Sequence, residues 1–239
     1  MFTANHFIWM GICAVLIGGG LFASLKFKFS FKTSALIMSG VALVSELSKI
    51  FSHIEESADG GKLSPAYLPL HLCSILIFLI FFITFSKNEQ LTRKIVSFIV
   101  PIAIWGGVLA ILIATSGVDF AKPYAYQCFI YHAALVWFAL YLIFTKQVDL
   151  GLKSYLRNLS VLSCMLIVMI WVNSALSEYN TNFFYVVRPP MKNLPVLNLD
   201  NGWFAYFMTI VAIGLVALTL THLRGIIRDI KELRSNAKK

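Results

Sequence analysis

Charged side chains are scarce in this 239-residue chain: Asp, Glu, Lys and Arg make up 13% of it, against 59% apolar residues. Such a composition excludes an ordinary soluble globular domain. The formal net charge of +9 does not indicate nucleic-acid binding, because the cations are spread over short connections and no nucleic-acid motif is present. The composition therefore predicts a polytopic membrane protein with membrane lipids as partners and no nucleic-acid partner.

Cysteine is also scarce, and its placement is informative. Cys13, Cys73, Cys128 and Cys164 all lie inside apolar stretches, and no two have the close spacing of a zinc site. This excludes a disulfide framework and a structural zinc site, and we expect neither a metal nor another cofactor. The absence of repeats and of low-complexity segments predicts one domain. Because Phe2–His6 lacks the cations of a secretory signal, we expect the first apolar stretch to stay in the protein and not to be cleaved off.

Long apolar runs are what the chain does contain. Crossing a hydrocarbon core of roughly 30 Å takes about 20 residues of helix, and seven stretches qualify. None alternates like a barrel strand, so we expect an all-α fold, a membrane bundle of seven transmembrane helices. The predicted spans are Phe7–Leu25, Ser34–Phe51, Tyr67–Ser86, Thr92–Ala114, Tyr124–Thr145, Leu156–Leu176 and Gly202–His222.

The distribution of Lys and Arg predicts the orientation of the bundle. Fifteen of the 20 cations lie in the first, third and fifth connections and in the basic tail, residues 224–239. The other side has only four, Lys62, Lys122, Arg188 and Lys192. By the positive-inside rule, the N-terminus lies outside and the C-terminal tail lies in the cytoplasm.

Polar side chains inside the predicted spans gather toward the outer side. Helical rise places them all within about 12 Å of the outer ends of their spans. Such groups are costly in lipid unless they pair or line a wet cavity, so they predict an outward-facing polar pocket. These side chains are Glu46, Lys49, His71, Gln127, His132 and Asn173.

Several interpretations of these residues stay open. Glu46 and Lys49 stand at i and i+3, so they can neutralise each other and fix packing only. His71 and Cys73 point in different directions on an ideal helix, so a nucleophilic Cys73 would need a base from another helix, such as His132, or His71 itself if Pro69 distorts the helix there. Cys128 and His132, at i and i+4, form a rival thiol–imidazole pair. Either cysteine could equally be a small packing residue.

The longest outer connection, residues 177–201, has the composition of a lid. Its aromatic run Phe183–Tyr185 precedes Arg188 and a rigid Pro189–Pro190 pair, which suits an interfacial lid over the pocket or an aromatic belt that anchors the loop. Within the fourth span, Pro101 and Gly106–Gly107 indicate a kinked or closely packed helix.

Several of these segments resemble the YwaF-like family of bacterial integral membrane proteins. The resemblance covers most of the chain, with two departures: Cys128 replaces the usual aromatic residue, and the family's Trp-Pro-Trp-Tyr type of ending is absent. The matching segments are Leu68–Cys73 (LPLHLC), Gln127–His132 (QCFIYH), Asn173 with Tyr179, Asn180 and Arg188–Pro189, and Gly202–Tyr206 (GWFAY).

The resemblance implies a multi-pass protein of a bacterial cell membrane. That family is distantly similar to the eukaryotic transmembrane protein 164 family, for which a cysteine-dependent acyltransferase acting on ether phospholipids has been proposed. Carried over, this makes Cys73 the acyl-accepting thiol, with His71 and His132 as base and as oxyanion or head-group partners. Tyr179, Asn180 and Arg188 become substrate-binding residues together with Glu46, Lys49, Gln127 and Asn173.

Three functions compete on these observations. A lipid acyltransferase or transacylase would use Cys73, and an outer site favours a phospholipid over cytosolic acyl-CoA as donor. A small-solute or proton-coupled transporter, or a ligand-binding receptor, would use the same polar residues to coordinate its ligand, but transport also needs access from the inner side. A membrane adaptor would use them only to lock helices together.

Overall fold

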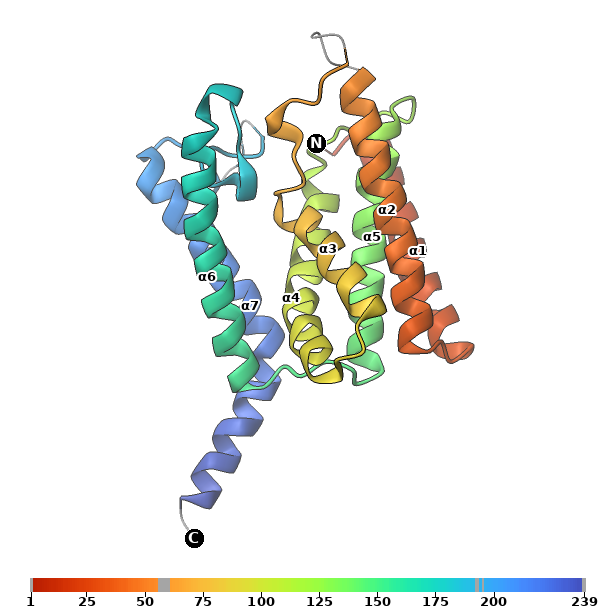
Figure 1. Cartoon of the computed structure of the whole chain (residues 1–239), viewed down its shortest axis with the longest axis vertical. Coiled ribbons are helices and arrows are strands. Elements are labelled where there is room, and N and C mark those ends of the chain that lie inside the picture. Colours follow the sequence, from red (N-terminus) through yellow and green to blue (C-terminus); the bar gives the residue numbers. More distant parts are fainter. Residues whose placement is uncertain (1, 56–60, 192–193, 195, 238–239) are drawn as a thin grey trace.

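The fold is an all-α bundle. A computed structural model describes residues 2–55, 61–191, 194 and 196–237, and in these parts it has seven α-helices, three short 3-10 helices and no strand. Figure 1 shows the helices running up and down one long axis, with the two ends of the chain at opposite ends of the bundle. Glu56, Asp59, Lys192 and the last two lysines of the tail lie outside the described residues.

The helix boundaries follow local signals in the sequence. α1 (Ala4–Lys26) begins at Thr3, whose hydroxyl accepts from the His6 amide, and α4 (Glu89–Ile113) begins at Asn88, whose side chain accepts from Leu91. α5 begins with a proline at its first position. The remaining long helices are α2 (Phe31–Glu55), α5 (Pro123–Phe144), α6 (Leu152–Ala175) and α7 (Gly202–Asn236).

Six of the described helices are long and apolar enough to cross a membrane, and α3 (Leu72–Phe85) is shorter. Its 14 residues span about 21 Å, less than the hydrocarbon core. The prediction of a helix from Tyr67 was therefore wrong at its start: a 3-10 helix, η1 (Pro65–Tyr67), is followed by a turn at Leu68–His71. Pro69 explains the difference, because proline disfavours helical backbone at the residue before it and cannot donate a backbone hydrogen bond.

The core lies around α4 and α5. More than half of the residues in the most apolar stretch of each of these two helices are buried, whereas a third or fewer are buried in the corresponding stretches of the other long helices. Gly107 allows their close approach, because a Cβ there would lie 3.0 Å from the His132 carbonyl oxygen and 2.6 Å from a methyl carbon of Val136. This glycine therefore sets the position of the α5 backbone at His132.

The helices α6 and α7 form a hairpin on one flank of the bundle (Figure 1). Buried polar contacts hold it to α4: the Asn158 amide donates to the Ser97 carbonyl at 2.7 Å and contacts His222 Nε2 at 3.3 Å. The Trp105 indole donates to Thr221 at 2.9 Å. α7 continues without a break to Asn236, so the described part of the basic tail is a helical extension of the last span.

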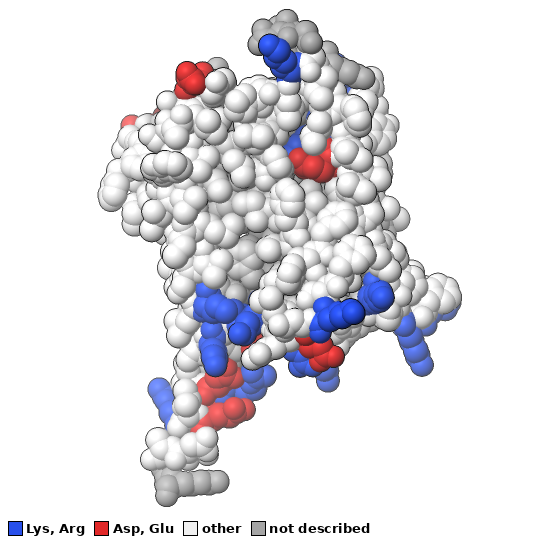
Figure 2. All heavy atoms as spheres, in the orientation of Figure 1, with Lys and Arg blue, Asp and Glu red and all other residues white. Residues whose placement is uncertain are grey.

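Charged side chains are distributed unevenly along the long axis. Figure 2 shows Lys and Arg gathered around the end of the bundle that carries the C-terminus, below a broad band with few charged side chains. Such a band is what a hydrocarbon core requires.

Candidate functional site

Cys73 lies in the first turn of α3, inside the bundle. It is the second helical residue after the N-cap, His71, and is partly buried. Two neighbours fix it: the Tyr131 hydroxyl donates to its carbonyl oxygen at 2.7 Å, and its sulfur lies 3.7 Å from where a Cβ at Gly106 would stand. No side chain caps this helix start. The first-turn N–H groups, which have no intrahelical acceptor, therefore remain close to the thiol.

His132 of α5 connects the two rival thiols. Its Nδ1 lies 2.7 Å from the Cys128 carbonyl oxygen and 3.6 Å from the Cys128 sulfur. The His132 ring is also close enough to the Cys73 side chain to interact with it electrostatically. A carbonyl oxygen can only accept, so Nδ1 carries the proton in this contact. In the neutral ring the other nitrogen, Nε2, is then the basic atom that is left for the Cys73 thiol.

The polar residues predicted on α2 and α5 form a junction beside this pair. Lys49 forms an ion pair with Glu46 at 2.5 Å and donates to the Ser74 hydroxyl at 3.2 Å. Gln127 donates to Ser45 at 2.6 Å. The junction therefore ties α2 to α5 and to the first turn of α3, and it brings an ammonium group next to the residue that follows Cys73.

His71 faces a different space from His132. Its ring lies edge-to-face with Phe183 and tilted against Tyr185, with centroids 5.5 and 5.1 Å apart. It lines a cavity of about 420 Å³ together with three other predicted residues, Tyr179, Asn180 and Arg188. We call this the outer cavity, after the side that the sequence predicts for it. The cavity thus brings His71 together with residues of the connection between α6 and α7, which are far from it in the sequence.

The outer cavity is polar and aromatic. Ser64, Ala66, Tyr67, Asn182 and Tyr185 complete its lining, and none of the described residues that line it is acidic. The Arg188 guanidinium, which donates to the Asn180 carbonyl oxygen at 2.6 Å, is the cation among these described lining residues. Burial raises the pKa of Tyr185 to about 12, so its phenol stays protonated at neutral pH. A cation, an imidazole and phenols suit an anionic group.

A family comparison covers the whole of this arrangement. The model of the TMEM164 family matches residues 1–222. The chain belongs to the TMEM164 family. No curated protein and no solved structure matches the chain. The matched range of this TMEM164-family protein includes every predicted site residue and ends where the basic extension of α7 begins.

Asn173 has a structural place in this TMEM164-family protein. Its amide donates to the Met169 and Phe183 carbonyl oxygens at 2.7 and 3.0 Å, and its oxygen accepts from the Phe183 amide at 2.8 Å. Phe183 is fully buried. Asn173 therefore holds the connection between α6 and α7, residues 177–201, to the end of α6. We call this connection the lid loop.

The lid itself has a strained backbone. Phe184 and Tyr185, in the 3-10 helix η3 (Phe183–Tyr185), have φ angles of 59° and 56°, which are unfavourable for large side chains. Two contacts from α7 oppose the strain: the Tyr206 hydroxyl donates to the Tyr185 carbonyl at 2.5 Å, and the Trp203 indole donates to Val186 at 2.8 Å. Several contacts thus hold the conformation that presents Tyr185 to His71, as expected for a site held in one geometry.

Several residues that build the site were not predicted from the sequence. Tyr131 and Tyr206 lie in the QCFIYH and GWFAY segments but were given no role. Their hydroxyls find carbonyl partners, and the physical signal for this is that a phenol buried in a span needs an acceptor. The buried Asn158 and His222 were likewise missed, although an amide and an imidazole in apolar helices give the same signal. Among the described residues, no group of three His, Cys, Asp or Glu could hold a metal ion.

Proposed function

We propose that this TMEM164-family membrane protein is a thiol-dependent lipid acyltransferase in which Cys73 is the nucleophile and His132 its base. The observation that supports it most is the position of the His132 ring, with Nδ1 on the Cys128 carbonyl oxygen and the Cys73 side chain within range of electrostatic interaction. A base oriented by a third group and facing a thiol is the arrangement that nucleophilic catalysis requires.

The reaction has two balanced halves. His132 Nε2 takes the proton of the Cys73 thiol while the sulfur attacks the carbonyl carbon of a phospholipid ester. The ester C–O bond breaks, and the protonated imidazole returns its proton to the departing lysolipid oxygen, which leaves a thioester on Cys73. An acceptor hydroxyl then loses its proton to His132 and attacks the thioester, which releases the acylated acceptor and restores the thiol.

The start of α3 supplies the electrostatic part of this proposal. The first-turn amides, which no side chain caps, can donate to the oxyanion that forms when the sulfur attacks. The positive end of the helix dipole and the nearby Lys49 ammonium can also stabilise the negative charge that develops during the attack. Interruption of the third span at Leu68–His71 is therefore functional, since irregular backbone at membrane depth is tolerated where it lines a polar site.

The outer cavity provides the place for the head group of the donor lipid. Arg188 and His71 suit a phosphate, and the lid loop closes over them from the outer side. We further propose seven crossings with the N-terminus outside, which is supported by the cations at the C-terminal end of the bundle (Figure 2). In this orientation the cavity opens toward the outer surface of a cell membrane.

Mass spectrometry of the full-length protein tests the proposal. After incubation in phospholipid vesicles, wild type should carry an acyl group on Cys73 that neutral hydroxylamine removes, as expected for a thioester. Cys73→Ala should lose the adduct and all transfer to a lysolipid acceptor. His132→Gln should slow adduct formation by about 100-fold or more, the usual contribution of a general base.

Two other cysteines serve as matched controls. Cys164→Ala removes an exposed thiol on α6, and Cys128→Ala removes the rival thiol but keeps the carbonyl that orients His132. Both should retain the adduct. If the adduct is lost in Cys128→Ala and persists in Cys73→Ala, the nucleophile is Cys128 and the proposal for Cys73 is wrong. If an active protein carries no adduct on any cysteine, the thioester mechanism is refuted.

A further inference from the structure

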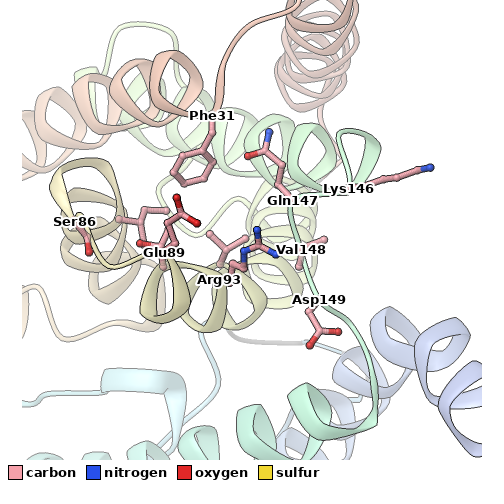
Figure 3. Close-up of a pocket in the computed structure, with 11 residues that line it drawn as sticks. Phe31, Ser86, Glu89, Arg93, Lys146, Gln147, Val148 and Asp149 are labelled. Atoms are coloured by element: carbon pink, nitrogen blue, oxygen red, sulfur yellow. The ribbon is translucent and has the colours of Figure 1, made fainter.

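A second polar cavity lies at the end of the bundle opposite to the outer cavity. It has a volume of about 460 Å³, which is within the range of small-molecule sites, roughly 300–1,000 Å³. Its walls come from the start of α2, the end of α3, the first turns of α4 and the connection between α5 and α6 (Figure 3). This is the end at which Lys and Arg gather (Figure 2).

Two opposite charges project into this cavity from one helix without pairing. Figure 3 shows Glu89 and Arg93 of α4 pointing into the space that Phe31 and Gln147 face from the other elements. A Glu four residues before an Arg is the favoured order for a helical ion pair. Even so, the ion pairs found in the described part of the chain are Glu46 with Lys49 and Arg228 with Asp229.

The other polar groups at the cavity have different roles. Asp149 accepts from the Gly151 amide and the Ser154 hydroxyl at 3.0 and 2.7 Å, so its carboxylate is already bound. Lys146 points away from the space in Figure 3. The Thr92 hydroxyl oxygen is buried and has no hydrogen-bond partner among the described residues. Ser86 accepts from the Asn88 amide, and the Gln147 amide nitrogen donates to Tyr141 and Thr145. The Glu89 carboxylate, the Arg93 guanidinium and the Thr92 hydroxyl are therefore the groups that we consider for a ligand.

We infer that this inner cavity binds a zwitterionic group, an ammonium and a phosphate a few bonds apart, as in phosphoethanolamine. Glu89 takes the ammonium, which also lies against the Phe31 ring, and Arg93 takes the phosphate with the Thr92 hydroxyl. A bound zwitterion would complete the separated Glu89–Arg93 pair, whereas a simple anion would meet the Glu89 carboxylate. The inference is independent of the chemistry proposed for Cys73.

The zwitterionic group could come from a membrane lipid or from solution. Ile83, Val96 and Val148 give it an apolar side at the ends of membrane spans, so the head group of an ethanolamine phospholipid could enter from the inner leaflet. A free phosphoethanolamine could enter from the aqueous side. Both sources use the same two charged residues.

Native mass spectrometry of the full-length protein in detergent tests this site with defined probes. We expect phosphatidylethanolamine to bind at least about tenfold more tightly than phosphatidylglycerol, which has the phosphate but no ammonium. Glu89→Gln should lower the affinity for phosphatidylethanolamine about tenfold and leave phosphatidylglycerol unaffected or bound more tightly. Arg93→Gln should weaken both lipids.

The control is Lys87→Gln, which removes an exposed charge next to the cavity that does not line it. Phe31→Leu keeps both charges and should weaken phosphatidylethanolamine alone, so the inference can still be tested if a charge variant fails to fold. Competition by soluble phosphoethanolamine would identify a free zwitterion as the ligand, and lipid binding without such competition would identify the head group. Equal binding of the two lipids, or Glu89 and Arg93 variants that behave like Lys87→Gln, would overturn the inference.

Discussion

The hydrogen bonds of Asn173 predict how firmly the lid is held. Replacing Asn173 with Ala removes all three bonds and leaves the amide and the carbonyl of the fully buried Phe183 without those partners. The Phe183 carbonyl keeps a bond from the Val186 amide at 3.5 Å, so the Phe183 amide is the group left unsatisfied. An unsatisfied buried backbone group costs about 1–3 kcal/mol, which should lower the opening free energy of the lid by the same amount. The lid should then open locally while the helices stay folded.

Hydrogen–deuterium exchange measures this opening directly. At about 1.4 kcal/mol per factor of ten, exchange at the Phe183 amide should be at least about fivefold faster in Asn173→Ala than in wild type. Ser160→Ala is the matched control, because that exposed hydroxyl of α6 bonds only within its own helix. Exchange that stays within threefold of wild type would refute the view that Asn173 anchors the lid.

Three further predictions concern topology, packing and pH. Impermeant thiol reagents should label a cysteine introduced at Lys62 in intact cells and one at Lys153 only after permeabilisation; the reverse would contradict the orientation. Gly107→Leu should lower thermal stability by about 1–3 kcal/mol or more and displace His132, measurable as loss of the Cys73 adduct, because its Cβ would overlap Val136. Burial opposes ionisation of Asp149, but hydrogen bonds from Gly151 and Ser154 outweigh it and lower the pKa of its carboxyl below 3.8. A lowered folded-state pKa stabilises the protein above the unfolded value, and this contribution is lost as pH falls through the folded value. Thermal unfolding of Asp149→Asn should therefore show lower stability than wild type at pH 7 and a smaller difference near pH 3; an equal difference at both would contradict it.

The features that depend on local composition could be predicted from the sequence. An apolar run in lipid must satisfy its own backbone, which makes it a helix wherever it occurs in the chain, so the all-α membrane fold needed no knowledge of contacts. The helix boundaries were less certain. Pro69 was noted as a point of distortion. The loss of the whole first part of the third helix, however, depends on what packs around Leu68–His71.

Which imidazole lies near Cys73 was decided only by the tertiary structure. His71 is two residues away in the sequence yet turns toward Phe183 and Tyr185, whereas His132, on another helix, lies within range of electrostatic interaction with the Cys73 side chain. Sequence spacing gives directions along one helix and leaves the distance between two helices open. That distance depends here on contacts such as Gly107 against the α5 backbone.

Polar residues show the same division between sequence and structure. Their presence in apolar spans follows from the sequence alone, and the cost of exposing them to lipid predicts that each has a partner. Whether that partner is a substrate or the protein itself was decided by packing: Asn173 is used by the lid, and Glu46 is paired with Lys49. The sequence by itself thus determined which side chains must be satisfied, and the tertiary structure decided with what, because only the packed helices bring their partners within hydrogen-bond distance.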